Sequence, residues 1–477
     1  MINVIFIAGK TLYRRNYSPL KNLPGPNSNN WLYGHMFEIF DEPLAAPVTT
    51  WINERLYPQG LMHVFGLFGT SYIFPTSPQA LAEVLSVRAY DYVKPTGFKR
   101  YTLRFWGHGI VSQEQEEHKQ HRKTYLPVFN QQNIDRLKGM LSTKSMQLFN
   151  HIAELCTKEQ SHDSSSECAE VVNITETIAK VSLDVTGIIS LGVDFETILG
   201  NHKEVFHAHE MLFTSTNEKK FLFLLYNIAP QWLLNILPSQ VARRLDNAHE
   251  TLVKVCRTVI RERLTQLGKN EPQVLDFLTN LVETGSFSED AAIAQIVVIL
   301  GAGYESTGGT LAWAIYCVAK HHDIQVKLRQ ELTDSRNRHG KIDEKDYDKL
   351  PLLNAVVMEA TRLYPAFSLL LRKAMRETTI NGQIIPRGTY VGLCPHAINY
   401  AQHLWGPDAD KFNPDRWIKA CCVGRALALA QMKRQLATLV ERYHLDRVDE
   451  KYDPRPSGLF ATSPPHDLQI KFTKLSA

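Results

Sequence analysis

Cysteine is scarce in this sequence, with seven among 477 residues. The number is odd and the spacing irregular, which argues against the disulfide framework of small secreted domains. We therefore expect reduced thiols in a reducing compartment. Two of the seven stand side by side, Cys421 and Cys422, and this pair needs a separate explanation.

An excess of one charge is also missing. The chain has 53 basic and 49 acidic residues, and no dense Lys/Arg tract with interleaved aromatic residues. A nucleic-acid-binding protein is therefore not indicated. No internal repeat and no long low-complexity linker divides the chain, so a single large domain is expected despite the length.

The N-terminus lacks an apolar run long enough to span a bilayer. The run in MINVIFIAGK has about eight residues, whereas a spanning helix needs roughly twenty. No small-residue cleavage site follows it, so it is a poor signal sequence. A first strand, a disordered end and the remnant of an anchor remain open. We assign residues 1–22 to an anchor remnant or linker, and residues 23–477 to one domain.

Helical periodicity dominates from Glu114 onward. Strand-like pieces lie near 61–75 and 369–393, and Asn381-Gly382 between two β-prone runs predicts a hairpin. The sequence thus predicts a mainly α fold with small peripheral β-sheets. The predicted helices are 115–125, 131–157, 173–190, 239–267, 288–319, 322–335, 350–363 and 423–443.

The longest apolar segment is the predicted helix that begins after Ser288, a natural N-cap. Its composition also suits a transmembrane helix. Glu305 argues against that alternative, because a carboxylate at the bilayer centre is costly. Four glycines near the midpoint weaken the helix further. A buried central helix, opened at its middle for a ligand, explains both features better. The glycines are Gly301, Gly303, Gly308 and Gly309.

The midpoint reads AGYEST. Gly303 would let a flat ligand approach the backbone, and Ser306 and Thr307 can hydrogen-bond back to carbonyls one turn earlier. An acid followed by alcohols, in an apolar wall, suits proton delivery into a dry cavity. A hydrogen-bonded buried Glu305 beside a helix kink would give the same pattern.

Three further groups of charged residues stand out. Glu359 and Arg362 lie three positions apart in an apolar stretch, so a buried ion pair is expected. His118 and Arg122 lie four positions apart and could grip an anion or form a basic surface turn. Arg372 stands among leucines, so it needs either a buried anionic partner or a head group that reaches water.

The cysteine pair precedes Gly424 and good helix formers. A thiolate at a helix N-terminus is stabilised by the dipole and by free N–H groups, which suits a metal ligand. Gly424 would let a large planar cofactor lie close. We take Cys422 as the candidate ligand and Cys421 as a bystander. Two small buried hydrophobes are the alternative.

Together these pieces resemble the cytochrome P-450 family of haem-thiolate monooxygenases, especially the fungal microsomal type, from about Leu12 to the C-terminus. The order and spacing of the motifs carry the resemblance. They are LPGP with a later GH, HKQHR, AGYEST, EATR, FNPDRW and CCVGRALALAQ, in which Gln431 replaces the family's Glu.

The resemblance implies roles for these residues. Cys422 would ligate the iron of haem b, and Glu305, Ser306 and Thr307 would relay protons. His118, Arg122 and Arg372 would bind the propionates, with Gly303 and Gly424 close to the cofactor. Glu359, Arg362 and Arg416 would form a structural network behind the haem.

The resemblance also implies the setting. One oxygen atom of dioxygen would enter an apolar substrate, with electrons from NADPH through NADPH-cytochrome P-450 reductase, at the cytoplasmic face of the endoplasmic reticulum membrane. Substrate contacts would come from Lys94–Ile110, Phe221–Pro238 and Ala366–Leu371.

The chain departs from the family pattern before the cysteine. Cys422 follows Arg416 by only six positions, a span of at most about 20 Å. The family's Phe-x-x-Gly-x-Arg segment is absent there. The sequence therefore also predicts an alternative, a haem-poor relative that is catalytically impaired.

Overall fold

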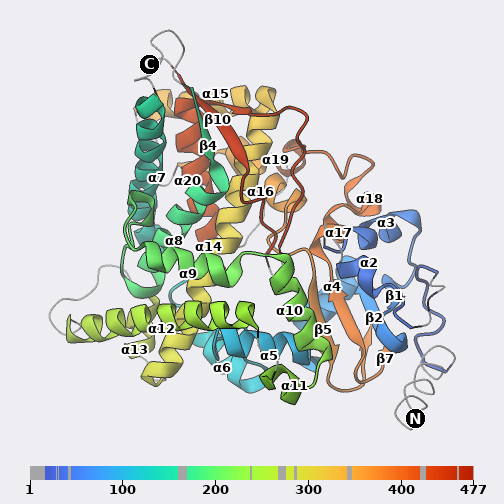
Figure 1. Cartoon of the computed structure of the whole chain (residues 1–477). Coiled ribbons are helices and arrows are strands. Elements are labelled where there is room, and N and C mark those ends of the chain that lie inside the picture. The colour runs from blue at the N-terminus through green and yellow to red at the C-terminus, as the bar shows by residue number, and fades with distance from the viewer. Residues whose placement is uncertain are drawn as a thin grey trace. The chain divides into compact units, whose positions relative to one another are not determined.

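The computed structural model describes residues 17–27, 30, 32–40, 44–159, 169–236, 239–266, 276–283, 287–340, 346–418, 426–458 and 461–475. Its elements form two compact units. Unit 1 comprises Met1–Arg100, Phe223–Leu234 and Phe367–Lys411, and unit 2 comprises Tyr101–Leu222, Asn235–Ala366 and Phe412–Ala477. Figure 1 labels the elements.

Unit 1 is built on a five-stranded sheet in the order β1-β2-β8-β5-β3. The β1–β2, β5–β8 and β3–β5 pairs are antiparallel, and β2–β8 is parallel. The strands are β1 (Leu61–Phe65), β2 (Ser71–Pro75), β3 (Tyr92–Val93), β5 (Leu370–Ala374) and β8 (Tyr390–Leu393). Short helices belong to the same unit: α2 (Met36–Phe40), α3 (Ala46–Glu54), η1 (Leu67–Gly69), α4 (Pro78–Ala82), η2 (Glu83–Val87), η3 (Ala89–Asp91), α17 (Pro395–Asn399) and α18 (Gln402–Trp405).

The predicted hairpin forms in unit 1. Strands β6 (Thr378–Ile380) and β7 (Gln383–Ile385) pair antiparallel across Asn381-Gly382. Both loop residues have positive φ, 46° and 78°. This is the backbone that a two-residue hairpin needs and that Asn-Gly adopts easily.

Unit 2 holds most of the helices and a three-stranded sheet in the order β4-β10-β9, with both pairs antiparallel. The sheet joins β4 (Ala169–Asn173), β9 (Tyr443–Arg447) and β10 (Gln469–Lys474). Its helices are α6 (Gln115–Tyr125), α7 (Gln131–Glu159), α8 (Ile174–Leu191), η4 (Thr197–Leu199), α9 (Lys203–Phe213), α12 (Gln240–Gln266), α13 (Phe277–Glu283), α14 (Glu289–Lys320), α15 (His322–His339), η5 (Tyr347–Lys349), α16 (Pro351–Leu363), α19 (Asp415–Ile418) and α20 (Ala426–Arg442). Helices α5 (Thr96–Phe105), α10 (Asn217–Ile228) and α11 (Gln231–Ile236) belong partly to each unit.

Helix α14 is the core of unit 2, and α8 runs beside it (Figure 1). Ser288 caps it as expected, accepting a hydrogen bond from the Ala291 N–H at 3.3 Å. Every side chain from Thr307 to Ala319 is buried. Of the described helices, only α14 is long and apolar enough to cross a membrane, and 61% of its apolar window is buried inside the protein. The burial agrees with the predicted central core helix.

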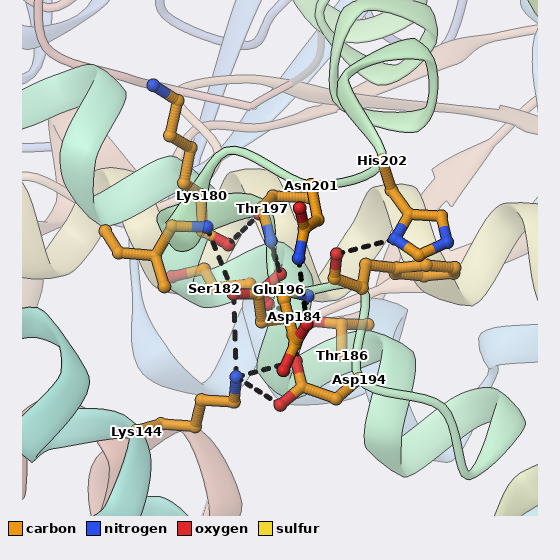
Figure 2. Close-up of polar contacts among 12 residues, drawn as sticks. Lys144, Lys180, Ser182, Asp184, Thr186, Asp194, Glu196, Thr197, Asn201 and His202 are labelled. Carbon is orange, nitrogen blue, oxygen red and sulfur yellow. Dashed lines mark hydrogen bonds and ion pairs between the residues drawn. The ribbon is translucent and has the colours of Figure 1, made fainter.

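A polar cluster fixes η4 to α8 and α7 (Figure 2). The buried Asp184 carboxylate accepts hydrogen bonds from the N–H and the hydroxyl of Thr197, both at 2.7 Å. Lys144 lies 3.6 Å from Asp184 and bonds Asp194 at 2.6 Å. Because the buried charges are all paired, the cluster holds this end of α8 without leaving an isolated ion.

Four of the seven cysteines lie in the described part of the chain. Cys156, Cys256, Cys317 and Cys394 are all free and buried. The other three cysteines lie outside the described residues.

Candidate functional site

The middle of α14 differs from the rest of the helix in its exposure. Ala302 is exposed, and Gly303, Glu305 and Ser306 are partly exposed, between two long buried stretches. The Ser306 hydroxyl donates to the Ala302 carbonyl at 2.7 Å, the predicted bond to the preceding turn. Helix α14 is continuous from Glu289 to Lys320, so its middle is uncovered without a break in the helix. Hydroxyl groups can bond a carbonyl that still belongs to the helix, so they need not break it.

The glycines of α14 pack closely against neighbouring helices. A Cβ at Gly301 would collide with the Phe213 ring of α9, and one at Gly303 would lie 2.7 Å from Thr186 Oγ1 of α8. A Cβ at Gly308 would lie 3.1 Å from Ser182 Oγ. Close helix packing thus accounts for Gly303 without a ligand, and its predicted contact with a cofactor stays a prediction.

Glu305 is an unusually weak acid for a carboxyl group. Burial raises its pKa to about 8, and the nearby Lys219 ammonium partly opposes that rise. Burial likewise lowers the pKa of Lys219 to about 8, while Glu305 and Glu210 pull it upward. Lys219 also donates to the Thr214 carbonyl at 2.7 Å. Glu305 is therefore mostly a neutral acid at pH 7 and can donate a proton.

The structure brings Glu359, Arg362 and Arg416 together. Arg362 binds both carboxylate oxygens of Glu359 at 2.7 and 2.8 Å, and both side chains are fully buried. Arg416 Nε lies 3.4 Å from the same carboxylate. The Asn413 N–H and the Trp417 indole N–H complete the set at 3.0 and 2.8 Å. The buried charges are thus matched by several donors, as a stable buried pair requires.

The predicted anion-binding residues occupy two elements. His118 and Arg122 lie on one face of α6, where His118 is partly buried and Arg122 exposed. Arg372 lies on β5 of unit 1, opposite Val391 in the register with β8, and donates to the Leu371 carbonyl at 3.0 Å. The exposure of Arg122 leaves the alternative of a basic surface segment open beside the predicted anion site.

Cys421, Cys422 and Gly424 lie outside the described residues. The helix predicted after them is α20. Its residues Leu427 to Leu429 are partly exposed, whereas those from Ala430 to Val440 are buried. Gln431, which departs from the family motif, is buried and donates to the Ser182 hydroxyl at 3.2 Å.

The described residues fit a haem in their chemistry. Its propionates require cationic donors, and residues of this type are present on α6 of unit 2 and, at Arg372, in unit 1. Its flat face requires an apolar wall of small side chains, which the uncovered Ala302–Gly303 segment supplies. A proton donor, Glu305, stands beside that segment.

Several residues in these clusters escaped sequence analysis. Lys219 gave no signal, because it is 86 positions before Glu305 and ordinary in its local pattern. Trp417 had a usable signal, since it directly follows Arg416 in FNPDRW.

Two of the three predicted substrate segments meet in unit 1. Arg100 donates to the carbonyls of Tyr226 and Ala229, the latter at 3.1 Å. Phe98 and Phe223 form an edge-to-face pair with centroids 6.4 Å apart.

The cytochrome P450 family model matches residues 24–472, nearly the whole chain. The chain belongs to the cytochrome P450 family. It is therefore an oxidoreductase of a family that uses haem to incorporate oxygen from dioxygen.

Fungal P450 enzymes are among the similar proteins. Cytochrome P450 monooxygenase sphH of Aspergillus fumigatus is 29% identical, over 97% of this chain and 90% of the relative. Cytochrome P450 monooxygenase ptmK of Penicillium ochrochloron is 29% identical, over 97% and 95%. FUM15 of Gibberella moniliformis is 30% identical, over 87% and 72%. The alignment with sphH spans 495 positions, more than the 477 residues of this chain, so the relative has residues where this P450 has none.

Proposed function

We propose that this P450 binds haem b and inserts one oxygen atom into an apolar organic substrate. Electrons come from NADPH through NADPH-cytochrome P-450 reductase. The observation that carries the proposal is the uncovered middle of α14, where an otherwise buried helix presents Ala302, Glu305 and Ser306. A helix that served only the core would be covered there.

Cys422 would supply the thiolate that binds the haem iron, and the haem would supply the oxygen-activating chemistry when bound. His118, Arg122 and Arg372 hold the propionates through charge-assisted hydrogen bonds. Gly303 and Gly424 lie close to the macrocycle in this proposal. Glu359, Arg362 and Arg416 keep the chain before the cysteine in place.

Glu305 is the proposed proton donor. With a pKa of about 8 it carries its proton at neutral pH. Ser306 already donates its own proton to the Ala302 carbonyl, so its oxygen lone pairs are free to accept one. Glu305, Ser306 and the adjacent Thr307 can therefore pass a proton toward the space beside Ala302.

The same sequence supports a second candidate, a haem-poor relative. Cys422 follows Arg416 by six positions, and so short a segment leaves little chain for a turn that directs N–H groups at the sulfur. In that case the fold persists while haem binding is impaired.

One experiment separates the two candidates. The full chain is purified with haem supplied, and haem content and the carbon monoxide difference spectrum of the reduced protein are measured. The monooxygenase proposal expects about one haem per chain and a thiolate-type spectrum in the wild type and in Cys421→Ser. Cys422→Ser should lose both. A wild type with neither haem nor spectrum supports the haem-poor candidate.

We place the protein at the cytoplasmic face of the endoplasmic reticulum membrane. In unit 1, Ile228 of α10 and Trp232 of α11 are both exposed. An exposed tryptophan and an exposed isoleucine four positions apart suit the lipid–water interface. These helices belong to the Phe221–Pro238 segment predicted to contact the substrate, so an apolar substrate would arrive from the lipid.

A further inference from the structure

Three side chains of metal-ligand type converge on the surface of unit 2, apart from the proposed haem residues. His322 is the first residue of α15, and His444 and Asp446 lie on β9. The Nε2 atoms of His322 and His444 lie 3.0 and 3.3 Å from the same oxygen, Asp446 Oδ1. All three donor atoms lie within 4.8 Å of one another.

The local structure dictates this convergence. His444 and Asp446 are two positions apart on a strand, so their side chains point to the same face. Tyr443 and Leu445, which alternate with them, are fully buried. The pleat therefore directs the two candidate ligands outward together.

The backbone of β9 is held rigidly to α15. The side-chain amide of the buried Gln325 accepts from the Leu445 N–H at 3.0 Å and donates to the Leu445 carbonyl at 2.9 Å. Arg329, one turn along the helix, donates to the Tyr443 carbonyl at 3.0 Å. Because Gln325 and Arg329 follow His322 on one helix, the three ligands are preorganised.

We propose that His322, His444 and Asp446 form a binding site for a divalent transition metal, with Zn²⁺ as the best match. Two imidazoles and one carboxylate without sulfur favour Zn²⁺, Cu²⁺ or Ni²⁺ over Mg²⁺ and Ca²⁺. Tetrahedral ligands about 2.0–2.2 Å from zinc lie about 3.3 Å from one another. The His444–Asp446 separation of 3.3 Å has this value, and the His322–Asp446 separation of 3.0 Å is slightly shorter. A water molecule would supply the fourth ligand.

Two features work against a cation and limit the affinity. His322 stands at the N-terminus of α15, where the helix dipole is positive. Lys471 lies opposite Asp446 in the register of β9 and β10. The ion pairs of Asp446 among the described residues join its Oδ1 oxygen to the two imidazoles, so that oxygen faces both of the other candidate ligands.

A bound metal would link the start of α15 to β9, the edge strand of the sheet. It would thereby cross-link two elements 122 positions apart, from His322 to His444. We therefore expect a structural site that stabilises unit 2, with no part in oxygen chemistry.

The test uses the full chain, freed of loosely bound metal with a chelator. Zn²⁺ binding is measured by calorimetry, and bound zinc by elemental analysis after dialysis. We expect one zinc per chain in the wild type, and at least a tenfold loss of affinity in His322→Ala, His444→Ala and Asp446→Asn. The three side chains are 55%, 36% and 28% exposed, so the variants should fold.

The control is His207→Ala. His207 is exposed and lies 3.5 Å from one carboxylate, Glu210, without a second imidazole. It should bind zinc as the wild type does.

A second measurement is the apparent melting temperature. It should rise with Zn²⁺ concentration in the wild type and in His207→Ala, and stay constant in His444→Ala. Equal zinc binding and equal melting behaviour in all variants would show that the trio is an ion pair only, and would overturn the proposal. Neither readout depends on haem, so failure here leaves the proposed monooxygenase function untouched.

Discussion

At the scale of single residues, the Glu359 carboxylate is the centre of a buried polar network. One buried carboxylate serves Arg362, Arg416, the indole of Trp417 and the backbone of Asn413. The last three lie between Phe412 and Ile418, immediately before the proposed haem cysteine. The carboxylate therefore connects α16 to the approach to that cysteine.

Replacing Glu359 with Gln should destabilise the protein by about 3–5 kcal/mol, because Arg362 would remain as an uncompensated buried charge. Chemical denaturation followed by circular dichroism measures the loss. The control, Glu218→Gln, breaks the exposed pair with Arg244 and should cost less than about 1 kcal/mol. Equal midpoints for the two variants would contradict the buried network.

Glu305 should make stability depend on pH. Its pKa is about 8 in the folded protein and about 4.5 when the chain is unfolded. The folded state therefore holds more protons between these values, and stability falls as pH rises through this window. Glu305→Gln should flatten the decline between pH 5 and 7.5, measured by denaturant unfolding at several pH values.

The matched control for this titration is Glu289→Gln, which changes an exposed carboxyl at the start of the same helix. It should keep the wild-type slope. A Glu305→Gln variant with that slope would show that Glu305 is not the titrating group.

Residue-scale prediction succeeded where partners are close in sequence. Glu359 and Arg362 share a helix face, so their spacing predicts contact. The electrostatic interaction of Lys219 with Glu305 depends on the tertiary packing of α10 and α14. No local sequence pattern carries that information.

At the scale of elements, α14 and α8 pack closely because small residues line their contact. Gly303 meets Thr186, and Gly308 meets Ser182. The tight contact leaves no space for an added methyl group.

Gly303→Ala should therefore destabilise the fold by about 1–3 kcal/mol, although alanine favours helices. Thr186→Ala in the same chain should recover part of the loss, as unfolding free energies would reveal. Gly139→Ala is the control: Gly139 lies within α7 with nothing within 4 Å of an added Cβ. It should be neutral or stabilising by up to about 1 kcal/mol. Equal losses at both positions would argue against the packing explanation.

Helices with strong periodicity were predicted well. The expected segment 115–125 is α6, and 322–335 falls within α15. The sheet of β4, β9 and β10 was missed, because β4 pairs with a strand nearly three hundred positions away. Such pairing depends on the whole fold, and strands of five or six residues give little local signal. The helix α9 was also missed; it has only 11 residues, a short window for detecting helical periodicity.

At the scale of the whole molecule, each compact unit is assembled from three separate stretches of chain. No change of composition marks their borders, so the sequence predicted one domain without internal divisions. The motifs nevertheless identified the family, because their joint order is specific even where each one alone is weak.

The proposed membrane contact predicts that Ile228→Ser with Trp232→Ser lowers binding to phosphatidylcholine vesicles at least tenfold. Burial of each side chain contributes roughly 1.5–3 kcal/mol, and 1.4 kcal/mol is a factor of ten. Vesicle sedimentation measures the binding. Val326→Ser with Val448→Ser removes two other exposed apolar side chains and should leave it unchanged. Similar losses for both double variants would point to non-specific adsorption.

The two hydrogen bonds between the Gln325 side chain and β9 have a consequence for self-association. An outermost strand normally offers unsatisfied peptide groups to any passing chain and can template fibrils. Gln325 occupies both peptide groups of Leu445 with its own amide, so it imitates the neighbouring strand that β9 lacks. Gln325 thus protects the edge of β9 from edge-to-edge aggregation.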